Sequence, residues 1–404
     1  MRNLAIAMSL VLVFFAFAGC GTGGEETTST EEQTTETTEE VMEDVEETAE
    51  EVSEEATQTT EGVLQEAEET TEEVVEEIAE TAEEVAEETE EVIEGESIGA
   101  KAGLSVNTSI ARSNSAGDDA GLAEVNSDIV AVIIDSEGRI TNCAIDSIQT
   151  KIQFTETGEI TTPLDKKFVG KQELGEEYGM IEVSSINKAW YEQANALSAY
   201  VIGKTVEEIK GISINEEGVP TEAELTSAVT MHIADYLAGI EEAAETATAN
   251  GVSADDQLGI GVKSTIERSK NATSEEDGVA QAYAKFALVT LDEGVISSCI
   301  IDSSQGEVKF NQEGEITSDL SAEIKTKKEA GESYGMKSVS EIGKEWYEQA
   351  EALEAYVIGK TLEEVSGISL NEEGVPTDSE LTSSVTISIS PYISVIEEAY
   401  NRAK

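Results

Sequence analysis

The stretch that decides the fold runs from Asp128 to Ser147 and reads DIVAVIIDSEGRITNCAIDS. Two apolar runs rich in β-branched residues flank the triplet Ser136-Glu137-Gly138, whose glycine suits the left-handed position of a tight turn. The stretch therefore predicts a β-hairpin. Upstream of it, apolar and polar residues alternate from Leu104 to Ile110, and this alternation predicts a further strand.

The same pattern recurs later in the chain. Cys143 matches Cys299 at a distance of 156 residues, and the same distance separates Trp190 from Trp346. We expect the match to run without a gap from about residue 99 to residue 400. Because strands come first and helices follow in each copy, the predicted fold class is α+β. It consists of two tandem copies of an antiparallel-sheet-plus-helices domain, over residues 97–250 and 251–404.

Each copy is predicted to end in helices. In the first copy, apolar residues at helical spacing predict a helix that opens near Ser184 or Ser185, buries Trp190 and ends before Gly203. Capping boxes predict short helices at Thr205 to Glu208 and at Thr361 to Glu364. Near the end of each copy, apolar and polar residues alternate, which predicts a strand before a final helix. The apolar residues are Val229, Met231 and Ile233 in the first copy and Val385, Ile387 and Ile389 in the second. Pro391 fixes the start of the final helix in the second copy.

Charge is unevenly distributed along the chain. The formal net charge is -62, and residues 25–96 hold 32 acidic residues and no basic one. Such a balance excludes nucleic-acid binding, because little in the chain could neutralise phosphates. Residues 20–96 are predicted to form an acidic stalk rich in Glu and Thr. Its valines recur every 11 residues from Val41 to Val85, so an extended spacer and a persistent helix or coiled coil both stay open.

The first residues have the features of a targeting signal. A short basic start precedes an apolar run over residues 4–17, too short for a transmembrane helix and suited to a signal peptide over residues 1–19. The run ends in Phe17-Ala18-Gly19-Cys20, which resembles the bacterial lipobox. This resemblance implies lipidation of Cys20 and a membrane-anchored lipoprotein on the extracytoplasmic face of the bacterial cell membrane. An ordinary secretory signal with cleavage near Gly19 is the alternative.

Few residues have the pattern of a catalytic or metal site. His232 is the single histidine, so no histidine-dependent site can occur in both copies. Cys143 and Cys299 lie in apolar strands as small buried residues, and a disulfide between them stays open. Asp146 and the equivalent Asp302 could be acid–base groups or turn residues. No catalytic residue and no metal ligand is therefore assigned.

One short motif occurs in both copies. The segments Glu224–Thr230 and Glu380–Thr386 read ELTSAVT and ELTSSVT. They resemble the D-x-x-[ST]-G-A-T motif of the extracytoplasmic FMN-binding domain family. Glu replaces the Asp of the motif in both copies, and Val replaces its Ala. Ala228 and Ser384 replace its Gly, a residue that allows close approach to a phosphate.

The resemblance implies FMN as the cofactor, esterified to Thr230 and Thr386 by a separate flavin transferase. Ser227 and Ser383 would lie near the phosphate, and the chain would pass electrons to a redox partner. It would then be an electron carrier more than a catalyst with its own substrate. The alternative is a noncatalytic surface protein, tethered to the membrane, that serves as a binding or structural module without flavin.

Overall fold

The computed structural model describes residues 99–248 and 251–404, which belong to one compact unit from Glu96 to Lys404. The predicted signal peptide, Cys20 and the predicted stalk up to residue 96 lie outside the described residues. The unit combines helices with two antiparallel sheets, so the predicted α+β class is confirmed. None of the helices in the described part is long and apolar enough to cross a bilayer.

Seven strands form the two sheets. The first sheet has the order β1-β2-β3 and the second has the order β4-β5-β6-β7, with every pairing antiparallel. The first sheet consists of β1 (Lys101–Ser109), β2 (Gly121–Ile134) and β3 (Ile140–Phe154). The second consists of β4 (Lys167–Val169), β5 (Gln257–Thr265), β6 (Gly278–Asp292) and β7 (Val295–Phe310).

The predicted hairpin is confirmed as β2 and β3. Gly138 has a φ of 73° and so takes the left-handed conformation that its turn requires. Asp135 closes the turn, because its Oδ1 accepts hydrogen bonds from the backbone N–H groups of Glu137 and Arg139, both at 2.9 Å. The strands extend beyond the apolar runs, since β2 already begins at Gly121.

Helices follow the strands in each half of the unit. The first half contains α3 (Lys171–Leu174), the 3-10 helix η1 (Gly175–Tyr178), α4 (Trp190–Val201), α5 (Val206–Lys210), α6 (Ala223–Thr226) and α7 (Ala234–Glu245). The second half contains α8 (Lys327–Ala330), the 3-10 helices η2 (Gly331–Tyr334) and η3 (Met336–Ser338), α9 (Trp346–Val357), α10 (Leu362–Ser366), α11 (Ser379–Thr382) and α12 (Ser390–Arg402). The predicted capping boxes of α5 and α10 are confirmed.

One predicted helix start and the predicted strand before each last helix are wrong. Helix α4 starts at Trp190, because Asn187 has a φ of 52° and the Ser184 hydroxyl accepts the N–H of Lys188 at 3.4 Å, so the chain turns there. The segment from Val385 to Ile389 is irregular, and so is its counterpart before α7. Val385 and Ile389 are buried and Ile387 is half-buried. The backbone N–H of Thr386 donates to the Gln349 side chain and that of Ile389 to the Gly374 carbonyl, so the segment forms no strand ladder.

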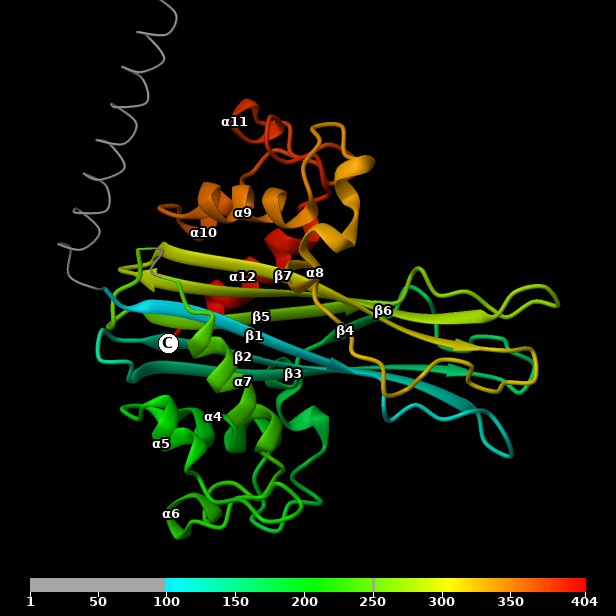
Figure 1. Cartoon of the computed structure of the whole chain (residues 1–404), viewed down its shortest axis with the longest axis horizontal. Coiled ribbons are helices and arrows are strands. Elements are labelled where there is room, and N and C mark those ends of the chain that lie inside the picture. Colours follow the sequence, from blue (N-terminus) through cyan, green and yellow to red (C-terminus); the bar gives the residue numbers. More distant parts are fainter. Residues whose placement is uncertain (1–98, 249–250) are drawn as a thin grey trace, which may run out of the picture. The chain divides into compact units, whose positions relative to one another are not determined.

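The two sheets pack face to face. Their inner faces share one hydrophobic core, in which the rings of Phe154 and Phe310 stack with centroids 4.1 Å apart and planes 9° apart. The outer faces are covered by helices, α4 and α7 on the first sheet and α9 and α12 on the second. In Figure 1 the sheets run across the middle, with α9–α11 above them and α4–α6 below.

The strand register contradicts the expected gapless match between the halves at β2 and β6. In β1, Thr108 pairs with Ser127, whereas its counterpart Ser264 in β5 pairs with Ala284, so β2 and β6 correspond at a distance of 157 residues. The turn before β7 is one residue shorter than the turn before β3. It is a two-residue turn in which Glu293 and Gly294 both have positive φ angles, the geometry that matches the twist of a hairpin.

The halves exchange short segments at the sheet edges. Strand β4 comes from the first half, yet it pairs with β5 of the second, with Phe168 opposite Ser264. In return, Ile324 of the second half forms a bridge with Thr108 on β1. Strands β1 and β5 are therefore each paired with a segment of the other half.

Candidate functional site

Thr230 and Thr386 lie in equivalent irregular segments before the last helix of each half. The Thr230 N–H donates to Gln193 Oε1 at 2.9 Å, and the Thr230 hydroxyl donates to the same atom at 3.4 Å. Thr386 binds Gln349 in the same way, at 2.8 and 3.2 Å. Both glutamines are completely buried. Each threonine therefore holds its segment against α4 or α9, and its hydroxyl already has a partner.

The structure does not bring the predicted serines to these hydroxyls. Ser227 and Ser383 are exposed residues that end the short helices α6 and α11. The Ser227 hydroxyl donates to the carbonyl of Glu224 at 3.4 Å. The N-cap residues of these two helices are Glu222 and Asp378.

A cavity lies next to each threonine segment, beside the first residue of α4 or α9. The cavity beside Trp190 has a volume of about 630 Å³, and the cavity beside Trp346 about 360 Å³. Met231 and His232 line the first cavity, so the chain reaches its wall directly after Thr230. We call them the first and second cavity. They share a set of lining residues, namely Lys171, Tyr178, Trp190 and Tyr236 in the first cavity and Lys327, Tyr334, Trp346 and Tyr392 in the second.

A lysine contacts aromatic rings at the same place in both cavities. Lys171 Nζ lies 4.8 Å from the ring centroid of Tyr178 and 5.2 Å from that of Trp190. Lys327 Nζ lies 4.6 Å from the Tyr334 ring and 5.1 Å from the Trp346 ring. These are distances at which a cation is attracted to the face of a ring. Both cavities thus combine an aromatic wall with a fixed positive charge.

The floors of the two cavities differ in charge. In the first cavity, Tyr236 donates to Asp128 Oδ1 at 3.2 Å. Burial raises the pKa of Asp128, and the Ser147 hydroxyl and the charge of Lys171 oppose this rise. In the second cavity, Tyr283 and Lys285 of β6 form the floor, so a lysine is present there instead of an aspartate. Lys327 donates to the Tyr283 hydroxyl at 2.6 Å.

The remaining sequence candidates have structural partners. His232 is exposed at the rim of the first cavity, with Nε2 3.2 Å from Asp235 Oδ2 and Nδ1 2.8 Å from the Glu217 carbonyl oxygen. Cys143 and Cys299 are free and buried, and burial raises the pKa of the Cys143 thiol to about 12. Within residues 99–248 and 251–404, no cluster of His, Cys, Asp and Glu could hold a metal ion.

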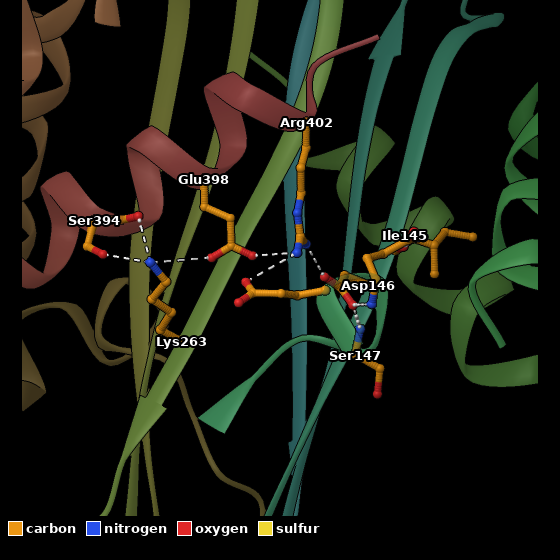
Figure 2. A network of polar contacts seen from close by, with 9 residues as sticks. Ile145, Asp146, Ser147, Lys263, Ser394, Glu398 and Arg402 are labelled. Carbon is orange, nitrogen blue, oxygen red and sulfur yellow. Dashed lines mark hydrogen bonds and ion pairs between the residues drawn. The ribbon is translucent and has the colours of Figure 1, made fainter. Parts of the chain in front are cut away.

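Asp146 belongs to a network that connects the two halves, shown in Figure 2. Arg402 of α12 lies 2.9 Å from Asp146 Oδ2, 3.0 Å from Glu398 Oε1 and 3.4 Å from Glu173 Oε2. Lys263 of β5 lies on the other side of Glu398, 3.9 Å from its Oε2. The equivalent Asp302 has no arginine, since Thr246 takes the place of Arg402. Asp146 therefore acts as a structural anchor for the last helix.

Sequence reasoning missed the cavities. Trp190 and Tyr178 were visible as aromatic residues, but only the fold places Lys171 and Asp128, from different elements, on one wall. One signal was available, because Lys285 interrupts an otherwise apolar strand. Comparison with protein-family models, curated proteins and solved structures gives no match to this chain.

Proposed function

We propose that this chain is a small-molecule-binding protein with two ligand sites, the first and the second cavity. The observation that carries this proposal is the shared arrangement of one lysine, one tyrosine and one tryptophan on the wall of both cavities. Cavities of about 630 and 360 Å³ fall in the size range of small-molecule sites. Aromatic walls with a few fixed polar groups are typical of such sites.

The two sites belong to two tandem copies of one domain in this proposal. Helices α4 and α9 begin 156 residues apart, and each begins with the tryptophan of a cavity. In each half three long strands come first, a short α-helix and a 3-10 helix follow, and the helix with the tryptophan comes after them. The segments exchanged at the sheet edges are also 156 residues apart. Duplication of a binding domain provides two sites whose walls are similar and whose floors can diverge.

The proposed place of action is the extracytoplasmic face of the bacterial membrane. The support is the sequence around Cys20, which resembles a lipobox, and the acidic segment over residues 20–96. A tethered binding protein with a long spacer holds its ligand sites away from the membrane surface. Metabolic labelling with a fatty-acid analogue tests the anchor, because label should be lost in Cys20→Ala.

A flavin carrier is the second candidate. It is favoured by one observation, that the chain reaches the wall of a cavity directly after Thr230 and Thr386. Attachment of FMN there would require each threonine hydroxyl to give up its hydrogen bond to the buried glutamine. Co-expression with a flavin transferase, followed by intact mass and visible spectrum, tests it. Yellow protein with one or two FMN adducts, absent from Thr230→Ala and Thr386→Ala, would establish the carrier.

Native mass spectrometry of the full chain isolated from its own cell tests the binding function. We expect noncovalent adducts of low mass, at most two per chain. The only two tryptophans lie one in each cavity, so a ligand should also change the intrinsic fluorescence. A protein without adducts, whose fluorescence no small molecule from a broad library changes, would contradict the proposal.

A further inference from the structure

Two buried lysines converge on one tyrosine in the second cavity. Lys285 and Lys327 are each only 6% exposed. Lys285 Nζ lies 3.6 Å from the centroid of the Tyr283 ring and donates to the Tyr283 carbonyl at 3.2 Å. Lys327 Nζ donates to the Tyr283 hydroxyl and also lies 4.8 Å from the ring centroid. Two ammonium groups therefore contact the same tyrosine in a largely buried place.

In the described part of the chain, neither lysine lies within ion-pair distance of a carboxylate. Among the described residues, Lys285 and Lys327 form no ion pair, and Arg268 adds a third positive charge 5.5 Å from the Tyr283 ring. Glu267 also lines the cavity and its charge acts weakly on Lys285, but its carboxylate forms its ion pair with Lys167, at 2.7 Å. Buried charges without an opposite charge are strongly unfavourable. In a chain with 86 acidic residues and only 24 basic ones, such a grouping calls for a ligand.

In the first cavity, a carboxylate balances the charge of the equivalent lysine. Asp128 pairs with Asn107 in the sheet, and Lys285 pairs with Lys263, the counterpart of Asn107, so Asp128 and Lys285 occupy equivalent places. Lys171 of the first cavity is therefore near a carboxylate, whereas Lys327 of the second is near another ammonium group. The charge of the floor has been inverted between the halves.

We infer that the second cavity binds a small organic anion, a carboxylate or phosphate with an aromatic body. Its acidic group would lie between Lys285 and Lys327, where both can donate charge-assisted hydrogen bonds. Its ring would lie against Trp346 and Tyr334, which line the same cavity. A volume of about 360 Å³ suits one substituted ring. This inference rests on the proposed function and names the ligand class of one of its sites.

The protonation of the cavity agrees with this geometry. Burial, together with the charges of Lys327 and Arg268, lowers the pKa of Lys285 to about 8, and Tyr283 opposes this fall. Burial alone would raise the pKa of Tyr283, but the neighbouring Lys327 and Lys285 bring it below its ordinary value. Besides burial, the charge of Lys327 contributes to both shifts, and a bound anion would offset that charge.

Isothermal titration of the full chain with benzoate, phenyl phosphate and inorganic phosphate tests the inference. We expect one site per chain for benzoate or phenyl phosphate. The probe that binds more tightly shows whether the site prefers a carboxylate or a phosphate group. Inorganic phosphate should bind at least tenfold more weakly, because it lacks the ring. Equal binding of inorganic phosphate would overturn the aromatic part of the inference, and no heat from any probe would overturn it entirely.

Variants locate the site. Lys285→Asp reproduces the first cavity and should weaken binding at least tenfold, and Lys327→Gln should do the same if Lys285→Asp does not fold. The matched control is Lys309→Asp, on an exposed part of β7, which should bind as the parent does. Unchanged affinity in a folded Lys285→Asp or Lys327→Gln protein would refute the inference.

The reverse change tests the two proposals separately. Asp128→Lys makes the first floor positive and should add a second anion site, with a change in the fluorescence of Trp190 in a Trp346→Phe background. Native adducts in the first cavity together with no probe binding in the second would refute this inference and leave the binding function standing. Absence of adducts and of probe binding would refute both.

Discussion

Removing Arg402 should destabilise the chain strongly and in a pH-dependent way. The guanidinium lies 2.9 Å from Asp146 and 3.0 Å from Glu398, whose side chains are 1% and 7% exposed. Arg402→Met keeps much of the apolar stem and leaves two buried carboxylates with little compensation, since Lys263 is 3.9 Å from Glu398. Breaking a buried ion pair in this way costs about 3–5 kcal/mol. We expect a loss of this size at pH 8.

The loss should shrink in acid. Burial raises the pKa of Glu398 to about 7, and Arg402 opposes this rise. Burial likewise raises the pKa of Asp146. For Glu398, the folded chain holds a proton more tightly than the unfolded chain, so its favourable contribution is present below pH 4.5 and is lost as the pH rises through 7. Without Arg402 both carboxyl groups should protonate more readily still, and the cost at pH 5 should fall to about half.

Urea unfolding at pH 5 and pH 8, followed by circular dichroism, measures both values. Arg139→Met is the matched control, because Arg139 forms only exposed ion pairs, which contribute at most about 1 kcal/mol. Adding Glu398→Gln to Arg402→Met should recover part of the loss at pH 8. A loss below about 1 kcal/mol at pH 8, or one of equal size at both pH values, would refute the reasoning.

Other predictions concern the core and the thiols. Phe310→Ala removes the ring stacked on Phe154 and should cost about 3–5 kcal/mol in urea unfolding, whereas a loss under about 1 kcal/mol would mean that the sheets repack freely. Gly259→Ala should prevent folding or lower the melting temperature by more than about 10 °C, because its Cβ would lie 1.9 Å from the Ala399 carbonyl oxygen. Cys143 should react with a thiol reagent at pH 8 only after denaturation, as peptide mass mapping would show, since burial raises its pKa to about 12.

Local signals in the sequence predicted the elements that local chemistry determines. The hairpin turn at Gly138 and the capping box at Thr205 depend on neighbours within a few residues, and both are confirmed. The alternation from Val385 to Ile389 correctly indicated that Val385 and Ile389 are buried, but the strand that it predicted is absent. Alternation shows which side chains face a core, but it does not show whether a neighbouring strand is available.

The candidate sites depend on contacts between distant residues. Arg402 and Asp146 are 256 residues apart in sequence. The inverted charge at Asp128 and Lys285 becomes visible only when the halves are matched with the one-residue shift that the strand register gives. The motif ending in Thr230 drew attention to the right segment, because the wall of a cavity begins at the next residue.

The exchange of edge segments determines what half of this unit could do alone. A first half separated from the second would keep β1 without the bridge from Ile324, and it would carry a β4 segment with no β5 to pair with. Two such halves could satisfy each other by reciprocal exchange, because β1 is the counterpart of β5. The two halves therefore depend on each other at their sheet edges, and the cavity on either side is built on an assembly that neither half completes by itself.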